Sequence, residues 1–155
     1  MEARRAAGII IYERKGQAFL MGLRADGQGW GFAAGKQEDN DSSLMDTALR
    51  ELKEELGVEL PQYLHEKVRF HKTILCKYIR IDKETHIASK HTILSDIFYL
   101  EVEDRSEINC NTDLLDGEVT AISWISLKEL CDDINIFMPS LIALNTLNLD
   151  FSFLN

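Results

Sequence analysis

The pattern of hydrophobic and polar positions begins with a predicted β-hairpin. Residues 6–14 (AAGIIIYER) and 18–24 (AFLMGLR) are short runs rich in aliphatic and β-branched side chains, which is typical of strands. The three residues between them, 15–17, suit a hairpin turn. The glycine-rich segment that follows predicts a loop, one short strand at 30–34 and a second loop.

A helical pattern starts at Ser43. Apolar residues recur there at every fourth position, at Leu44, Ala48, Leu52 and Leu56. Gly57 stands where a C-terminal cap is expected, and Ser43 with Asp46 three residues later resembles a capping box in which Asp replaces Glu. Together these signals predict a helix with one apolar stripe.

Two long β-rich stretches follow Pro61. They span 68–81 and 91–102 and are joined by the polar segment 82–90, which predicts an antiparallel pair. Residues 103–117 read as a loop.

The C-terminal part predicts one more strand and two helices. VTAISWI at 119–125 is the strand, and SLKELCDDI at 126–134 is a short helix capped by Ser126. Pro139 then starts a last apolar helix. Because no repeat or linker interrupts the chain, we expect residues 1–155 to form one α/β domain whose helices cover a mixed, largely antiparallel sheet.

Composition and charge narrow the classes of partner. Lys and Arg number 17 against 26 Asp and Glu, a net charge of -9, which excludes a protein that coats nucleic acid or an anionic membrane surface. An acidic protein still binds a small phosphate compound when divalent cations stand between the two negative partners. A small anionic substrate therefore remains compatible with this sequence.

Cysteine usage and the N-terminus bear on the compartment. Cys76, Cys110 and Cys131 are odd in number and lack metal-ligand spacing, which argues against a disulfide framework and a zinc site. The apolar run near the N-terminus ends at Tyr12, too short for a signal peptide or a membrane span. We expect a cytoplasmic protein.

The predicted helix also carries an acidic face. Glu51, Glu54 and Glu55 fall within an arc of about 100° beside the apolar stripe, and like charges at this spacing repel each other. A solvated surface helix is one interpretation, since Arg50 is close enough to offset some of the charge. A divalent-cation site is the other, because Mg²⁺ prefers oxygen ligands and is often held by a few carboxylates plus substrate phosphates.

The surrounding sequence favours the cation site. The stretch GKQEDNDSSLMDTALRELKEELGV resembles the Nudix box, a Gly, five residues, a Glu, seven residues, and then Arg-Glu-apolar-any-Glu-Glu-any-Gly-apolar. Every fixed position of the second half is matched, by Arg50, Glu51, Leu52, Glu54, Glu55, Gly57 and Val58. The N-terminal hairpin, the aromatic segment GWGFAAGK and the WISLKEL segment are similar to the family as well. The resemblance implies a Nudix-like α/β/α sandwich.

The first half of the box departs from the pattern. From Gly35 to Arg50 there is one residue more than the box allows, so either the loop has an insertion after Gly35 or Lys36 takes the place of the glycine. We favour the insertion, because loops accept extra residues at little cost. Asp41 or Ser42 then stands where the first Glu of the box is expected.

The resemblance implies a metal-dependent hydrolase. Nudix enzymes hold Mg²⁺ or Mn²⁺ and cleave a nucleoside diphosphate linked to another moiety, such as a nucleoside triphosphate, a nucleotide sugar or a dinucleotide. By this resemblance Glu51, Glu54 and Glu55 are the expected metal ligands, with the carbonyl of Gly35, and Arg50 orients Glu51. Cations at this place would neutralise the diphosphate and activate a water molecule.

The catalytic base is left open between two sources. In this family it is a glutamate of the helix or a carboxylate of a later loop. Glu118 is the preferred loop candidate and Asp116 the second, although each also fits a solvated loop acid. Glu38 is a further candidate, as an outer ligand.

Four residues near the box are expected to bind substrate. Trp30 and Phe32 are suited to stacking on a nucleobase, although core packing is the alternative for at least one of them. Lys36 and Arg24 are candidates for phosphate contacts. The sequence contains no signature that identifies the substrate.

Two alternatives to the enzyme remain at this point. A Nudix-fold binding module would sense nucleotides without cleaving them, and an interaction protein with an acidic helix would not need Gly35, Arg50 and Gly57 at these spacings. Similar proteins are often homodimers, and the apolar tail 149–155 suits burial against a partner or against its own core.

Overall fold

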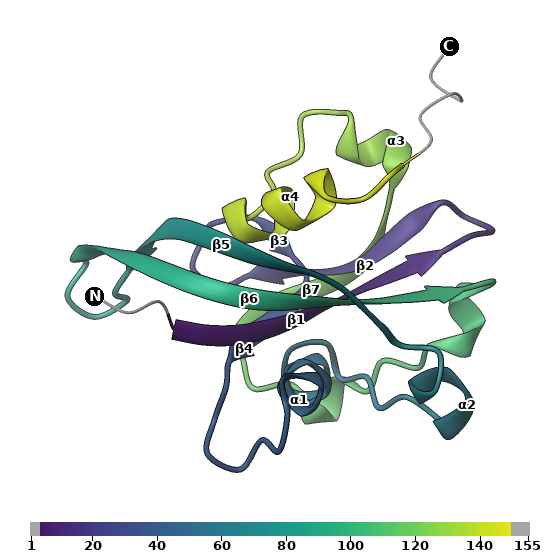
Figure 1. The fold of residues 1–155 in the computed structure, drawn as a ribbon. Coiled ribbons are helices and arrows are strands. Elements are labelled where there is room, and N and C mark those ends of the chain that lie inside the picture. Colours follow the sequence, from purple (N-terminus) through teal and green to yellow (C-terminus); the bar gives the residue numbers. More distant parts are fainter. Residues whose placement is uncertain (1–3, 150–155) are drawn as a thin grey trace.

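A computed structural model describes residues 4–149 of the chain. One mixed sheet lies between two layers of helices (Figure 1). The strands are β1 (Arg4–Glu13), β2 (Ala18–Arg24), β3 (Trp30–Gly31), β4 (Ala33–Lys36), β5 (Arg69–Ile81), β6 (Ala88–Val102) and β7 (Val119–Ser126). The helices are α1 (Leu44–Leu56), α2 (Gln62–His65), α3 (Leu127–Leu130) and α4 (Met138–Asn145), with short 3₁₀ turns η1 (Arg105–Glu107) and η2 (Thr112–Leu114).

The predicted strand pairs form. β1 and β2 make the N-terminal hairpin, and β5 and β6 make the long antiparallel pair. The sheet has the order β3-β2-β1-β6-β5, with β4 paired to β1 and β7 paired to β2. β1 and β6 run parallel, whereas the other pairs of named strands are antiparallel. The prediction of a mixed, largely antiparallel sheet is confirmed.

The prediction of a single strand at 30–34 is wrong. Trp30 and Gly31 pair with β2, whereas Ala33 onward pairs with β1, so the segment changes partner at Phe32. The Phe32 N–H donates to Ser140 Oγ of α4 at 3.0 Å instead of to a strand. The segment therefore forms two short strands, β3 and β4, that pair with different neighbours in the sheet.

The helices cover opposite faces of the sheet. α1 and α2 lie on one face, and α3 and α4 lie on the other (Figure 1). α1 has the predicted ends, because the Ser43 side chain accepts from the Asp46 N–H and Gly57 adopts a left-handed conformation with φ 67°. The α/β/α sandwich is therefore confirmed.

The helix predicted at 126–134 is shorter than expected. The capping box of Ser126 and Glu129 is present, but α3 ends at Leu130. The chain then turns so that Ile134 and Ile136 pack on the core below α4, and Asn135 accepts the N–H of Trp30 at 2.9 Å. A continued helix would have carried these apolar side chains away from the sheet.

Two apolar clusters fill the space on either side of the sheet. Ile9 and Ile11 of β1 point to the α1 side, whereas Ile10 points to the α4 side, as the two-residue period of a strand requires. Leu52 and Leu56 supply the apolar stripe of α1 to the first cluster. The acidic face of the same helix is thereby fixed beside β4.

Three further findings concern the cysteines, the lengths of the helices and the C-terminal tail. Cys76, Cys110 and Cys131 form no disulfide with one another. Within residues 4–149, no helix is long and apolar enough to cross a membrane. The predicted burial of the apolar tail 149–155 involves residues 150–155, which lie outside the described part of the chain.

Candidate active site

The acidic face of α1 is largely buried. Glu51 and Glu55, one helical turn apart, are only 8% and 5% exposed, and Glu54 is partly exposed beside them. Helical geometry places all three on the side that meets β4 and the later loops. The solvated surface helix is therefore excluded as an explanation for Glu51 and Glu55.

Glycine at position 35 allows α1 to approach the sheet. Gly35 pairs with Ala7 of β1, and a Cβ atom at this position would collide with the Glu51 carboxyl group. The neighbouring Ala34 N–H donates to Glu55 Oε1 at 3.3 Å. Strand β4 thus sets the positions of both buried carboxyl groups.

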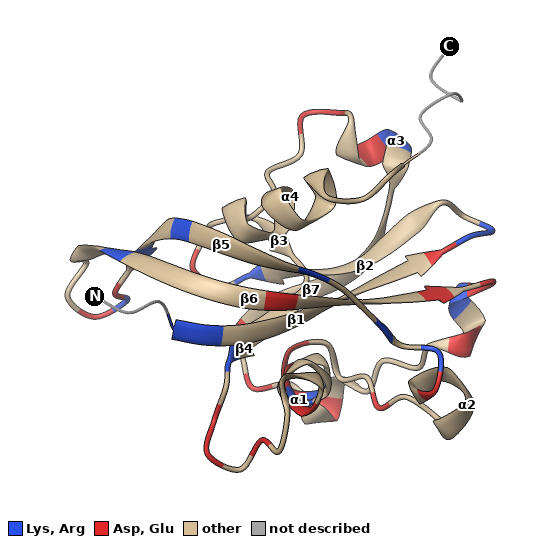
Figure 2. Ribbon diagram, viewed as in Figure 1, with Lys and Arg blue, Asp and Glu red and all other residues tan. Residues whose placement is uncertain are grey.

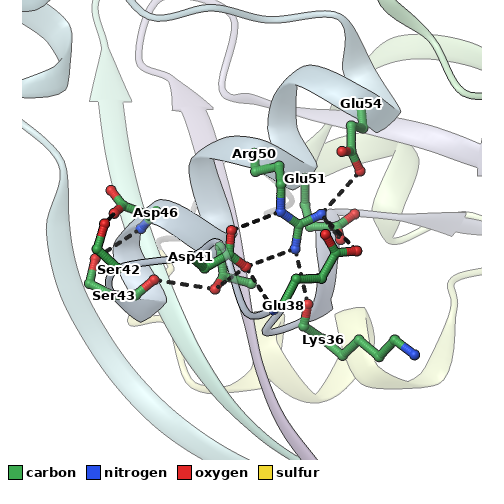
Figure 3. A network of polar contacts seen from close by, with 10 residues as sticks. Lys36, Glu38, Asp41, Ser42, Ser43, Asp46, Arg50, Glu51 and Glu54 are labelled. Atoms are coloured by element: carbon green, nitrogen blue, oxygen red, sulfur yellow. Dashed lines mark hydrogen bonds and ion pairs between the residues drawn. The ribbon is translucent and has the colours of Figure 1, made fainter.

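Arg50 joins the loop to the helix (Figure 3). Its Nε and Nη2 donate to the two oxygens of Asp41 at 2.9 and 3.0 Å. Its Nη1 donates to Glu51 Oε1 at 3.0 Å and to Glu54 Oε2 at 3.1 Å. Nη2 also donates to the Lys36 carbonyl at 3.0 Å. One guanidinium group therefore orients two of the predicted ligands.

Asp41, and not Ser42, is the residue of the loop that pairs with Arg50. Its side chain is 4% exposed, and besides Arg50 it accepts the Thr47 hydroxyl and the Glu38 N–H, each at 2.9 Å. The hydrogen bonds from Arg50 hold the pKa of Asp41 well below its usual range despite burial. This carboxylate remains ionised and fixes the loop to α1.

Two serines hold the start of α1. The Ser42 hydroxyl donates to Asp46 Oδ2 at 2.6 Å, while Ser43 caps the helix. The expected capping box is therefore only half formed, because the Asp46 carboxylate turns to Ser42 and not back to Ser43. This local network lies beside the contacts of Arg50 (Figure 3).

The buried acids suit a divalent cation. Burial raises the pKa of Glu51 and of Glu55, and the close approach of the two groups raises that of Glu55 further. A cation is the ordinary means of keeping two such groups ionised. With the exposed side of Glu54, the set offers hard oxygen donors on one helix face.

The donor set does not form a closed cage. Within residues 4–149, no three acidic, histidine or cysteine side chains converge as a ready metal site. Mg²⁺ commonly takes only one or two carboxylates, with substrate phosphates and water in its other positions. The residues present fit that kind of open site.

The loop before β7 brings two further acids to α1. The Asp116 N–H donates to the Glu54 carbonyl at 3.0 Å, and the Glu118 N–H donates to Asp116 Oδ1 at 3.0 Å. Glu118 is near enough for its charge to raise the pKa of Glu55. Both candidate loop bases thus lie by the carboxyl groups of the helix.

A cavity of about 860 Å³ opens beside these acids. Its lining includes Glu51 and Glu54 from α1, Gly35 and Lys36 from β4, and Glu118. Its floor is formed by the α4-facing side of β1 and β6, and its far wall by β5 and the start of α4. Carboxylates at one part and an apolar floor elsewhere suit a ligand with a charged and a flat end.

The predicted substrate residues separate into two groups. Arg24, Phe32 and Lys36 line the cavity, although Phe32 is only 8% exposed and also packs edge-on against Phe19. Trp30 is not among the lining residues and packs on the α4-side cluster. Glu38 lies at the cavity with Oε1 3.6 Å from Arg50 Nη1.

The aromatic residues on one side of the cavity, here called the aromatic wall, were not predicted from the sequence. Tyr78 and His91 face each other across β5 and β6, and Phe137 comes from the segment before α4. No motif marks these residues, which are far apart in the chain. The strand register predicts only that Tyr78 and His91 are neighbours.

Comparisons with known proteins bear on the family and the fold of this chain. The sequence matches the NUDIX domain over residues 2–144. A search of curated proteins found no match. A NUDIX hydrolase from Alicyclobacillus acidocaldarius has TM-score 0.61 and 14% identity, over 94% of this chain and 90% of that chain. A MutT NUDIX hydrolase from Burkholderia pseudomallei has TM-score 0.58 and 18% identity, over 96% and 100%.

A third similar structure is longer. It is a bifunctional NMN adenylyltransferase/ADP ribose pyrophosphatase from Francisella tularensis, with TM-score 0.64 and 17% identity. The match covers 93% of this chain and 40% of that protein's length. At these identities the structures establish a shared fold. The domain match over nearly the whole sequence establishes the relationship itself, and this chain belongs to the Nudix family of hydrolases.

Proposed function

We propose that this chain is a metal-dependent pyrophosphohydrolase that cleaves a nucleoside diphosphate linked to another moiety by attack of water on phosphorus. Family membership supports hydrolysis of a phosphorus anhydride. The observation that carries the metal dependence is the pair of buried acids, Glu51 and Glu55, beside Glu54 at the cavity.

We assign the cation to the open carboxylate site. Glu51, Glu54 and Glu55 would hold Mg²⁺ or Mn²⁺, with the Gly35 carbonyl as a further donor. When bound, the cation neutralises phosphate charge and lowers the pKa of a bound water molecule. A second structure of the Francisella tularensis enzyme is described as complexed with AMP and a Mn ion, which supports this choice of ion and ligand class.

The chain's own residues would orient the reactants. Arg50 holds Glu51 and Glu54 in place through one guanidinium nitrogen, so these carboxylates need little reorganisation when the site fills. Lys36 would contact a phosphate from the cavity wall, since its side chain points away from Arg50 (Figure 3).

The base would be a carboxylate close to the reacting water. Glu118 is our preferred candidate, because its N–H donates to Asp116, which is itself anchored to the backbone of α1. A glutamate of the helix is the other choice, and the pH profile of Glu118→Gln at saturating Mg²⁺ separates them. If Glu118 is the base, kcat falls and its acidic limb is lost, whereas a helix glutamate as base leaves that limb in place.

The wider setting is proposed on simpler grounds. We infer that residues 1–155 act as one domain and that the protein works in a reducing compartment, the cytoplasm, because its three cysteines are unpaired. We also infer a homodimer, since Leu75, Ile79 and Ile81 leave apolar side chains exposed along β5. Light scattering tests the assembly.

The hydrolase proposal is tested by chromatographic detection of the products of anhydride cleavage, a nucleotide and the phosphorylated leaving moiety. Nucleoside triphosphates, nucleotide sugars and dinucleotides are each incubated with and without Mg²⁺. Wild type is compared with Glu54→Gln and Glu55→Gln, and with Glu59→Gln as a matched control. Glu59 is an exposed acid just beyond α1 that pairs with Lys53 and does not line the cavity.

Metal-dependent turnover that falls about 100-fold or more in Glu54→Gln and Glu55→Gln, but not in Glu59→Gln, is the expected result. If no compound turns over while nucleotides still raise the melting temperature, a nucleotide-binding module replaces the enzyme. Equal turnover in all four proteins would remove α1 from the reaction.

A further inference from the structure

We propose that Arg24, held flat against Phe137 by Asp26, is a stacking platform for the nucleobase of the substrate. The inference rests on the proposed function, since it assigns the base-binding part of the same cavity. It also changes the role expected for Arg24 from a phosphate contact to a base contact.

Asp26 fixes the plane of the Arg24 guanidinium. Arg24 Nη2 donates to Asp26 Oδ2 at 2.7 Å, and Nε lies 3.1 Å from both carboxylate oxygens. Asp26 is held in turn by the backbone N–H of Gln28 at 3.1 Å and by its side-chain amide at 3.0 Å. The guanidinium therefore has one edge occupied and little freedom to rotate.

Phe137 covers one face of that plane. The central carbon of the Arg24 guanidinium lies 3.9 Å from the centre of the Phe137 ring, which is itself only 8% exposed. Arg24 lines the cavity and retains 27% of its side-chain exposure. With one face and one edge occupied, its outer face is the part that remains for a ligand.

The neighbouring wall is aromatic. Tyr78 meets Phe137 edge-on, with ring centres 5.6 Å apart, and lies 5.7 Å from His91 on the adjacent strand. The floor below is formed by β1 and β6, where Ala6, Gly8 and Ile97 line the cavity together with the polar Ser95 and, at the N-terminal end of β1, Arg4. This part of the cavity suits a flat ring system better than a charged group.

The charge of Arg24 argues against a phosphate contact. Its guanidinium is already paired with the Asp26 carboxylate, so a phosphate would have to compete for the same donors and approach a second negative group. A nucleobase needs no such exchange, because guanidinium planes and aromatic rings stack on any base face. The contact therefore recognises a nucleobase, without choosing among the bases by hydrogen bonds.

The test measures binding without turnover. Nucleoside monophosphates of all four bases and ribose 5-phosphate, which lacks a base, are titrated calorimetrically into the full chain in a chelator. Arg24→Lys keeps the ion pair with Asp26 but loses the flat face. Arg80→Lys is the matched control, since Arg80 lines the same cavity yet is exposed.

We expect nucleotides to bind more tightly than ribose 5-phosphate. Arg24→Lys should weaken nucleotide binding about 5-fold or more and leave ribose 5-phosphate unaffected, and Arg80→Lys should leave the difference between the two ligands intact. As a measurement that does not depend on a variant, intermolecular NOEs should join base protons to the side-chain protons of Arg24 in wild type.

Equal affinity for nucleotides and ribose 5-phosphate would overturn the platform, as would NOEs that join the base to other side chains and none to Arg24. The test separates the stacking-platform proposal from the hydrolase proposal. Turnover without base-dependent affinity removes the platform alone, whereas Arg24-dependent nucleotide binding without any turnover keeps the platform and removes the hydrolase.

Discussion

The loop half (35–43) and the helical half (44–58) of the segment 35–58 are held in place by different kinds of interaction. In the helical half, each carboxylate lies where the period of α1 puts it, and seven family positions occur in register. In the loop half, the family pattern is not matched position for position, yet the Arg50 guanidinium still finds a buried carboxylate, that of Asp41. A helix fixes side chains through its backbone, whereas this loop is fixed by one pair of side chains.

Local contacts hold the junction between the two halves. The Ser42 hydroxyl donates to Asp46, and Ser43 caps the first turn of α1. The bidentate contact between Asp41 and Arg50 then closes the loop over the helix. Three substitutions test how far the two halves depend on each other.

Arg50→Ala should have the largest effect on stability, because Arg50 is the link between the halves. It would leave Asp41, Glu51 and Glu54 without their shared partner, and Asp41 is nearly buried. We expect a loss of about 3 kcal/mol or more in the free energy of unfolding. Urea unfolding measures this, with Arg50→Lys as the control that keeps the charge. A loss below about 1 kcal/mol would mean that the halves are independent.

Asp41→Asn should have a smaller and pH-dependent effect. At neutral pH we expect a loss of about 1 to 3 kcal/mol, since the carboxylate is buried and accepts four hydrogen bonds from neighbouring groups. Its pKa is depressed on folding from the ordinary 3.8, so the stability it contributes is complete above that value. That contribution is lost as the pH falls below about 4 toward the folded-state pKa.

The difference in unfolding free energy between wild type and Asp41→Asn should therefore be constant at neutral pH and shrink in acid. Asp39→Asn, two residues earlier on the exposed part of the loop, is the matched control. A difference that does not depend on pH in acid would show that the ion pair is not what holds the loop.

Ser43→Ala should have the smallest effect, because it acts on the helix alone. Loss of an N-cap side chain costs about 1 kcal/mol. Ser42→Ala removes only an exposed contact with Asp46 and should stay within about 0.5 kcal/mol. Thermal unfolding of both variants gives the comparison. A Ser42→Ala effect as large as that of Ser43→Ala would show that the contact of Ser42 with Asp46 also holds the start of α1.

The same contrast describes what the sequence could predict. Periodicity and caps predicted α1, the hairpin and the strand pair β5 and β6, because these are set by local pattern. The change of partner at Phe32 could not be predicted, since it depends on Ser140, more than a hundred residues away. The early end of α3 likewise depends on where Ile134 and Ile136 find the core.

The candidate site shows this division as well. The acids of α1 follow from the motif, and their burial follows from the neighbouring apolar stripe. The loop candidate, Asp41 or Ser42, was resolved only by the position of Arg50. Arg24 was expected at the site. Its partner Asp26 is local, two residues along the chain, whereas Phe137 meets it only through tertiary folding.

The measurement that tests the central claim most directly is Mn²⁺ binding without substrate, followed by electron paramagnetic resonance. Wild type is compared with Glu51→Gln, Glu55→Gln and the control Glu59→Gln. If the helical half carries the cation site, the first two variants should bind Mn²⁺ about 10-fold or more weakly and the control should match wild type. Equal Mn²⁺ binding in all four proteins would contradict a metal site on α1.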